Sequence, residues 1–156
     1  MPRSLYMRYY LLGLGLLITD QLTKMAVRNR LDIGESIDVL GSFFQITHVE
    51  NRGAAFSILI GRTGLLIAVT LIVVAVAIGF LHTHKGKHWL MYTSGAMIIS
   101  GGIGNLIDRA LFGHVTDMFD FSIFPPVFNI ADIAVVVGCV LCLIYVVFED
   151  RLNRTA

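Results

Sequence analysis

Long apolar stretches separated by short polar segments dominate the pattern of hydrophobic and polar positions. Each of four stretches approaches the roughly 20 mostly apolar residues that a membrane-spanning helix needs. They cover residues 9–27, 64–81, 89–107 and 131–148. The pattern therefore predicts an all-α membrane protein with four transmembrane helices.

The polar connection between the first two predicted helices has a different period. Its segments "SIDVL" and "FFQITHVE" alternate between apolar and polar residues on either side of Gly41 and Ser42. Such alternation around a turn is typical of a β-hairpin, so we expect a small hairpin at about residues 36–50. The next segment, "GAAFSIL" at 53–59, predicts a short helix at the membrane interface.

The connection between the third and fourth predicted helices, "FGHVTDMFDFSIFPPVF", reads differently. It contains Gly113, Pro125 and Pro126, which break regular structure, together with five phenylalanines. We expect an irregular segment that lies at the membrane surface.

Composition agrees with a membrane protein and excludes other classes. Of the 156 residues, 56% are hydrophobic and 15% are charged, whereas about a quarter of the residues in soluble domains are charged. We expect one integral membrane domain over residues 1–156. The net charge of +1 provides no basic surface for nucleic acid. Cys139 and Cys142 lie inside the last apolar stretch, where we interpret them as small hydrophobic residues.

Polar side chains gather at one end of the predicted bundle, where the first and third helices end and the second and fourth begin. A transporter is expected to place such groups near the middle of the membrane as well, so one shallow site at one face is the simpler interpretation. These residues are Asp20, Lys24, Asn51, Arg52, Asn105, Asp108, Arg109, Asp117, Asp120, Asn129 and Asp132.

Some of these charges have partners in the sequence. Asp20 and Lys24 are four residues apart and can neutralise each other on one helix face. Asn105, Asp108 and Arg109 are expected to share a face of the third helix, where Asp108 would pair with Arg109.

The acids left without a partner are Asp117, Asp120 and Asp132. Two carboxyl groups at a water-accessible membrane edge suggest an aspartic-type site, in which one stays ionised as base and the other keeps a proton as acid. A plainer interpretation makes Asp132 the cap of the fourth helix, a role that Asn129 can also fill.

Sidedness is encoded most clearly by the loop "HTHKGKH" at 82–88. This short loop contains basic residues and no acid, which favours the cytoplasm. Both termini of this multi-pass chain would then be cytoplasmic, and the polar end would lie near the outer face.

Five segments also occur in a characteristic order: "DQLTK" at 20–24, "NRGAAF" at 51–56, "GGIGNLIDR" at 101–109, "VTD" at 115–117 and "FNIAD" at 128–132. In order and spacing, over about residues 9–148, they resemble the motif blocks of the lipoprotein signal peptidases (signal peptidase II). That family consists of aspartic peptidases of the bacterial cytoplasmic membrane. The resemblance implies cleavage of diacylglyceryl-modified prolipoproteins on the N-terminal side of the lipidated cysteine. It also implies that the hairpin at about residues 36–50 is a small extracytoplasmic β-cradle for the substrate.

The resemblance also implies roles for individual residues. It makes Asp117 and Asp132 the catalytic pair and ranks Asp120 below Asp117. Met118 and Ile133 stand where the family often has Phe and Ser, which concerns substrate fit rather than chemistry. The residues implied to bind substrate or brace the site are Asp20, Lys24, Asn51, Gly53, Asn105, Asp108, Arg109, Asn129 and Ala131.

The expected partners are prolipoprotein substrates and membrane lipids, with no cofactor, no metal and a monomeric chain. Two alternatives stay open on the residues alone. One is a small proton-coupled membrane transporter that uses Asp20 and Lys24. The other is a scaffold whose polar residues only join helices, which would tolerate replacement of Asp by Asn.

Overall fold

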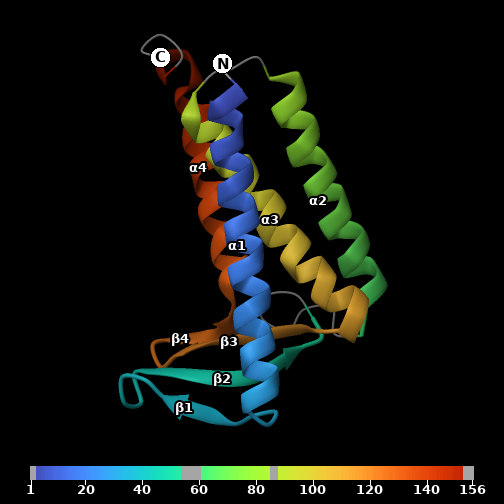
Figure 1. Ribbon diagram of the computed structural model, residues 1–156, viewed down its shortest axis with the longest axis vertical. Helices are drawn as coiled ribbons and strands as arrows, with labels where there is room; N and C mark the ends of the chain where they lie inside the picture. The colour runs from blue at the N-terminus through green and yellow to red at the C-terminus, as the bar shows by residue number, and fades with distance from the viewer. Residues whose placement is uncertain (1–2, 54–60, 85–87, 153–156) are drawn as a thin grey trace.

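Four helices run side by side in the computed structural model, and a small sheet lies across one of their ends (Figure 1). The structure describes residues 3–53, 61–84 and 88–152. The N-terminal end of α1 and the C-terminal end of α4 lie at the end opposite the sheet (Figure 1). The helices are α1 (Arg3–Arg30), α2 (Thr63–Thr83), α3 (Trp89–Phe112) and α4 (Ile130–Leu152).

Three helices of the described ranges are long and apolar enough to cross a membrane. They are Thr63–Thr83, Trp89–Phe112 and the part of α4 over Ile130–Glu149. Helix α1 is longer still, with 28 residues, but its C-terminal half carries Asp20, Lys24, Arg28 and Arg30. The prediction of a mostly helical membrane protein is confirmed, and three of its four predicted spans have the required length and composition.

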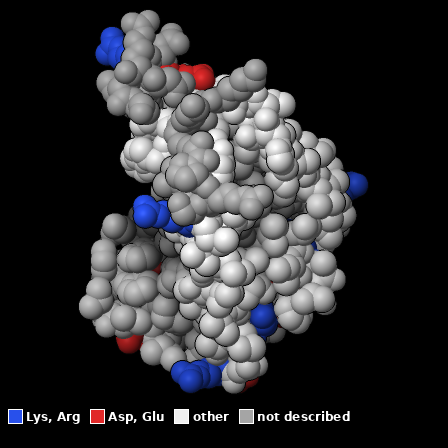
Figure 2. Space-filling view, turned by 45° about the horizontal axis from the view of Figure 1, so that its top comes forward, with Lys and Arg blue, Asp and Glu red and all other residues white. Residues whose placement is uncertain are grey.

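The surface of the helices suits a membrane. Ile72, Val76 and Val147 are each more than three-fifths exposed, at 62%, 65% and 63%. The face in Figure 2 is mostly uncharged, and its charged side chains stand apart from one another. Soluble monomers rarely expose apolar surface so extensively, so this surface is suited to contact with lipid.

Helix α3 contacts each of the other three helices and organises the bundle. Gly101 of α3 packs against the carbonyl oxygen of Ala131 in α4, where a Cβ atom would collide with it. Gly138 of α4 lies equally close to α3, because a Cβ atom there would be 2.8 Å from Cγ1 of Ile98. Small residues let helix backbones approach closely in a membrane. The contacts hold the first turn of α4 against α3.

The sheet has four strands in the order β1-β2-β3-β4, and every neighbouring pair is antiparallel. Its strands are β1 (Ser36–Asp38), β2 (Phe44–Asn51), β3 (Val115–Phe121) and β4 (Phe124–Phe128). The hairpin predicted around Gly41 is confirmed, since Ser36 pairs with Thr47 and Asp38 pairs with Gln45.

The expectation of an irregular segment before the fourth helix is wrong, because β3 and β4 form there. Val115, Asp117, Phe119 and Phe121 stand at alternate positions, as a strand requires. The two prolines lie in β4, an edge strand, where a missing N–H is tolerated. The sheet is therefore built from two distant parts of the chain and is larger than the predicted cradle.

Aromatic rings cover part of this sheet. Phe44 stacks on Phe121 with ring centroids 4.5 Å apart, and Phe121 stacks on Phe128 at 5.9 Å. Phe119 lies edge-on to Phe128. It also packs against a small buried cluster formed by Val27, Leu31 and Met118. The expected interfacial helix at 53–59 lies outside the described residues, apart from Gly53.

Candidate active site

Asp117 and Asp132 come from different elements and meet through shared hydrogen-bonding partners. Asp117 lies on β3 and is 2% exposed. Asp132 lies in the first turn of α4. The side-chain nitrogen of Asn129 donates to Asp117 Oδ1 at 2.6 Å, while the Oδ1 atom of Asn129 accepts the backbone N–H of Asp132 at 2.9 Å. Asn129 thus links the two acids directly.

The start of α4 is a reciprocal cap. The backbone N–H of Asn129 donates to Asp132 Oδ2 at 3.2 Å, which returns the bond that Asn129 Oδ1 accepts from Asp132. This is the geometry of a capping box. The second oxygen of Asp132 accepts from Asn105 Nδ2 at 2.8 Å. Asn129 is thus the N-cap of α4, and Asp132 completes the cap from three residues on, so the two alternatives for capping this helix are both partly right. One oxygen of Asp132 is left facing the polar cluster.

Asp117 is held from the other side by Asn51 of β2. Asn51 Nδ2 donates to Asp117 Oδ2 at 2.9 Å, and Asn51 Oδ1 accepts the backbone N–H of Gly53 at 2.9 Å. Both carboxyl groups are therefore oriented by amide side chains, each of which is itself fixed by a further contact.

A second layer of charge lies behind the amides. Lys24 is fully buried and approaches Asp20 at 3.0 Å, Asn105 Oδ1 at 3.0 Å and Asp108 at 3.5 Å. Asp20 in turn accepts the backbone N–H of Ala131 at 2.9 Å. These contacts join α1 to α3 and to the start of α4. The predicted pairing of Asp20 with Lys24 is confirmed.

The predicted pairing of Asp108 with Arg109 is wrong for the described residues. Asp108 faces α1, where it lies 3.5 Å from Arg28, and it also accepts the backbone N–H of Thr116 at 3.0 Å. Arg109 instead donates to the carbonyl oxygen of Gly53 at 3.2 Å. Neighbouring residues of a helix do not face each other, so Asp108 and Arg109 cannot share a face.

The environment of Asp117 changes its acidity. Burial raises the pKa of Asp117 to about 7, and the nearby carboxylate of Asp132 acts in the same direction, whereas the hydrogen bonds from Asn51 and Asn129 oppose the rise. An acid with a pKa near neutrality can hold and release a proton under physiological conditions. This is the property that a general acid requires.

Asp120 is separated from this cluster in its contacts. It pairs with Gln45 across the ladder and accepts a hydrogen bond from the Thr47 hydroxyl group at 3.0 Å. The same hydroxyl group also contacts that of Ser36. The structure thus distinguishes Asp120 from Asp117, which composition alone could not do.

The sequence analysis did not identify three residues that belong to this cluster. Gln21 donates to Asp20, to the Gly104 carbonyl oxygen and to Asp108. Arg28 and Thr116 form a hydrogen bond that joins α1 to β3. Arg28 follows Lys24 by four residues, so the helical period could have placed both on one face.

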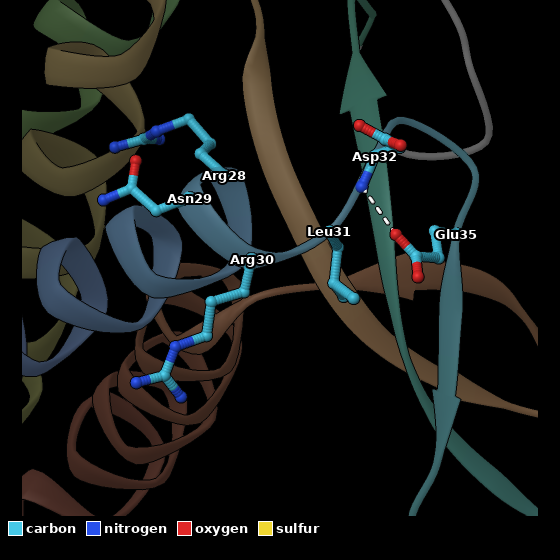
Figure 3. A pocket seen from close by; sticks show the side chains of 6 residues that line it. All are labelled: Arg28, Asn29, Arg30, Leu31, Asp32 and Glu35. Atoms are coloured by element: carbon cyan, nitrogen blue, oxygen red, sulfur yellow. Dashed lines mark hydrogen bonds between the residues drawn. The ribbon is translucent and has the colours of Figure 1, made fainter.

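One small pocket lies at the C-terminal end of α1 (Figure 3), apart from the two acids. Glu35 there accepts the backbone N–H of Asp32 at 2.8 Å. In the described ranges no three His, Cys, Asp or Glu side chains are grouped so as to hold a metal ion. The pocket is lined by Arg28, Asn29, Arg30, Leu31, Asp32 and Glu35.

Comparison with known proteins agrees with this arrangement. The family model described as "Signal peptidase (SPase) II" matches residues 12–148. A lipoprotein signal peptidase of Clostridioides difficile is 42% identical over 149 residues, covering 95% of this chain and 100% of the relative. A lipoprotein signal peptidase of Halothermothrix orenii is 38% identical over 144 residues, covering 92% and 98%.

A solved structure described as a bacterial membrane enzyme at 2.3 Å resolution superposes with a TM-score of 0.85. It is 32% identical in sequence and covers 94% of this chain and 90% of its own. Similarity in sequence and in fold therefore extends over nearly the whole chain, and the chain belongs to the signal peptidase II family of aspartic-type membrane peptidases.

Proposed function

We propose that this enzyme removes the signal peptide from diacylglyceryl-modified prolipoproteins by cleaving N-terminal to the lipidated cysteine. In this proposal Asp117 and Asp132 together activate one water molecule. The observation that carries it is the link through Asn129, which holds the two acids from β3 and α4 in one cluster.

The chemistry follows from two carboxyl groups that share one proton. We assign this proton to Asp117, whose pKa is raised to about 7, and the role of the base to Asp132. Asp132 takes a proton from water while the water oxygen attacks the scissile carbonyl carbon, and Asp117 protonates the carbonyl oxygen. Asp132 then gives its proton to the amide nitrogen, and Asp117 takes back a proton from one hydroxyl group of the intermediate as the C=O bond re-forms. The C–N bond breaks, an amine and a carboxylic acid are released, and the pair again holds one proton.

The surrounding residues act by orientation. Asn51, Asn105 and Asn129 hold the carboxyl oxygens. Arg109 and Gly53 join the end of α3 to the strand that carries Asn51. The bracing residues behind them are Asp20, Lys24, Asp108 and Ala131, whose contacts fix α1, α3 and α4 relative to one another.

The transporter alternative gains no support. Asp20 and Lys24 are buried against each other and against fixed partners from α3 and α4. Membership of a peptidase family also contradicts the scaffold interpretation. Both observations favour the hydrolytic reaction.

The first prediction concerns the two acids. Asp117→Asn and Asp132→Asn each lower the cleavage rate of a lipidated precursor by roughly a hundred- to ten-thousandfold, because one partner can no longer exchange a proton. Purified variants in detergent are compared with the wild type, and Asp120→Asn is the matched control that keeps activity. An active Asp117→Asn beside an inactive Asp120→Asn would show that the wrong acid has been chosen.

The second prediction concerns pH. Asp117 loses its proton as the pH rises through about 7, and two ionised carboxylates then leave the site without a general acid. We therefore expect kcat/KM to fall above neutrality, approaching roughly tenfold per pH unit. Initial rates measured across the neutral range test this, with Asp120→Asn following the same curve. A rate that keeps rising into alkaline solution would contradict the assignment.

The third prediction concerns the substrate. Two acyl chains hold a precursor at the depth of the bilayer, since each buried methylene contributes about 0.8 kcal/mol, and they help to place the scissile bond beside the acids. The lipidated form should be cleaved much faster than an unmodified precursor of the same sequence in the same vesicles. Equal rates for the two forms would instead indicate a general membrane peptidase.

The fourth prediction concerns sidedness. We propose that one monomeric domain crosses the bacterial cytoplasmic membrane four times, with α1 spanning it in addition to α2, α3 and α4. Both termini would lie in the cytoplasm, and the sheet would lie near the outer face, in contact with membrane lipids. In a background with Cys139 and Cys142 replaced by alanine, Ile123→Cys at a sheet turn is labelled by an impermeant thiol reagent in intact cells. Thr83→Cys, at the C-terminal end of α2, stays unlabelled. The reverse pattern would invert the topology.

A further inference from the structure

We propose that Arg28 is a positioning residue for the reaction, which holds β3 through the Thr116 hydroxyl group so that Asp117 keeps its place beside Asp132. The inference rests on the proposed role of these two acids. The contacts of Arg28 are with Thr116, Asp108 and Phe112, so it would act on the pair through Thr116.

Three contacts fix the guanidinium group of Arg28. Its Nη1 atom donates to Thr116 Oγ1 at 3.0 Å and lies 3.5 Å from Asp108 Oδ1. Its central carbon lies 4.4 Å from the centroid of the Phe112 ring. A planar cation held by a hydroxyl group, a carboxylate and an aromatic face has a defined orientation. Arg28 therefore joins the last turn of α1 to α3 and β3 at once.

Thr116 is anchored at two points. It is fully buried, its side chain accepts from Arg28, and its backbone N–H donates to Asp108 Oδ2 at 3.0 Å. Successive residues of a strand point to opposite sides, so fixing Thr116 toward α1 directs the next side chain, Asp117, the other way. There it meets Asn51 and Asn129.

The ladder between β2 and β3 is interrupted just beyond Asp117. The pairing of β2 with β3 shifts between Ile46 and Val49, immediately beside the pair of Val49 with Asp117. An irregularity of this kind interrupts the ladder and bends the strand. Asp117 is therefore the last residue of the regular ladder before the shift, and Thr116 is its neighbour on the regular side. The contact of Thr116 with Arg28 adds a constraint on β3 one residue from Asp117.

Lys24 and Arg28 are each connected to one of the two acids through an intermediate residue. Lys24 donates to Asn105, which donates to Asp132. Arg28, one turn later on α1, acts on Asp117 through Thr116. Both cations also contact Asp108. One face of α1 thus controls the positions of both acids.

Arg30 provides a matched control. It is exposed in the same last turn of α1, and its side chain points away from that of Arg28 (Figure 3). Replacing Arg30 removes the same charge from the same helix end without removing the contact with Thr116.

The experiment compares Arg28→Gln, Thr116→Val and the double variant with Thr116→Ser and Arg30→Gln, by measuring kcat and KM on a lipidated precursor. Arg28→Gln and Thr116→Val should each lower kcat by roughly ten- to a hundredfold with KM nearly unchanged. Because both remove one contact, the double variant should be no slower than the slower single variant. Thr116→Ser, which keeps the hydroxyl group, and Arg30→Gln should retain wild-type kcat.

Wild-type kcat in folded Arg28→Gln or Thr116→Val would overturn the inference, as would losses that multiply in the double variant. If Arg28→Gln does not fold, Thr116→Val, which keeps the shape of the side chain, decides the question together with Thr116→Ser. Normal turnover in Thr116→Val beside an inactive Asp117→Asn refutes the positioning role alone. An active Asp117→Asn refutes the proposed function itself.

Discussion

The burial of Lys24 is the constraint on which the rest of the structure depends. An ammonium group removed from water costs several kcal/mol unless its hydrogen bonds and its charge are matched, and Lys24 is matched by Asp20, Asn105 and Asp108. These partners come from α1 and α3, and Asp20 continues the contact to the backbone of Ala131 in α4. Loss of either carboxylate would leave the buried charges unbalanced, so α1, α3 and the start of α4 must meet in one arrangement.

This arrangement separates structural charge from reactive charge. Lys24 and Arg28 balance Asp20 and Asp108, and the four charges neutralise one another on the side of α1. Asp117 and Asp132 receive mainly uncharged amide donors from Asn51, Asn105 and Asn129. Amides can orient a carboxyl group without fixing it as a permanent ion pair. This suits the proposed reaction, in which the pair exchanges protons while the ion pairs of Lys24 and Arg28 with Asp20 and Asp108 hold its surroundings in place.

Much of this was predictable from the sequence, and the failures share a cause. Helical period correctly joined Asp20 to Lys24, and the short motifs correctly grouped Asn105 with Asn129 and Asp132. The partner of Asp108 was missed because it depends on which helix faces α3, which no local spacing encodes. Strand β3 was missed because one of its pairing partners, β2, lies in a distant segment. The prolines that follow it suggested an irregular segment rather than an edge strand.

The two interpretations of Asp132, as a helix cap and as half of a reactive pair, describe one geometry. Its Oδ2 atom caps the backbone of Asn129, and its Oδ1 atom faces Asn105. A carboxyl group tied by a capping box has little rotational freedom left to lose when a substrate binds. In the proposed reaction the cap that starts α4 also preorganises the base, because the interaction that stabilises the helix is the one that orients its carboxyl oxygens. The capping bond and the hydrogen bond from Asn105 together fix the orientation of the Asp132 side chain.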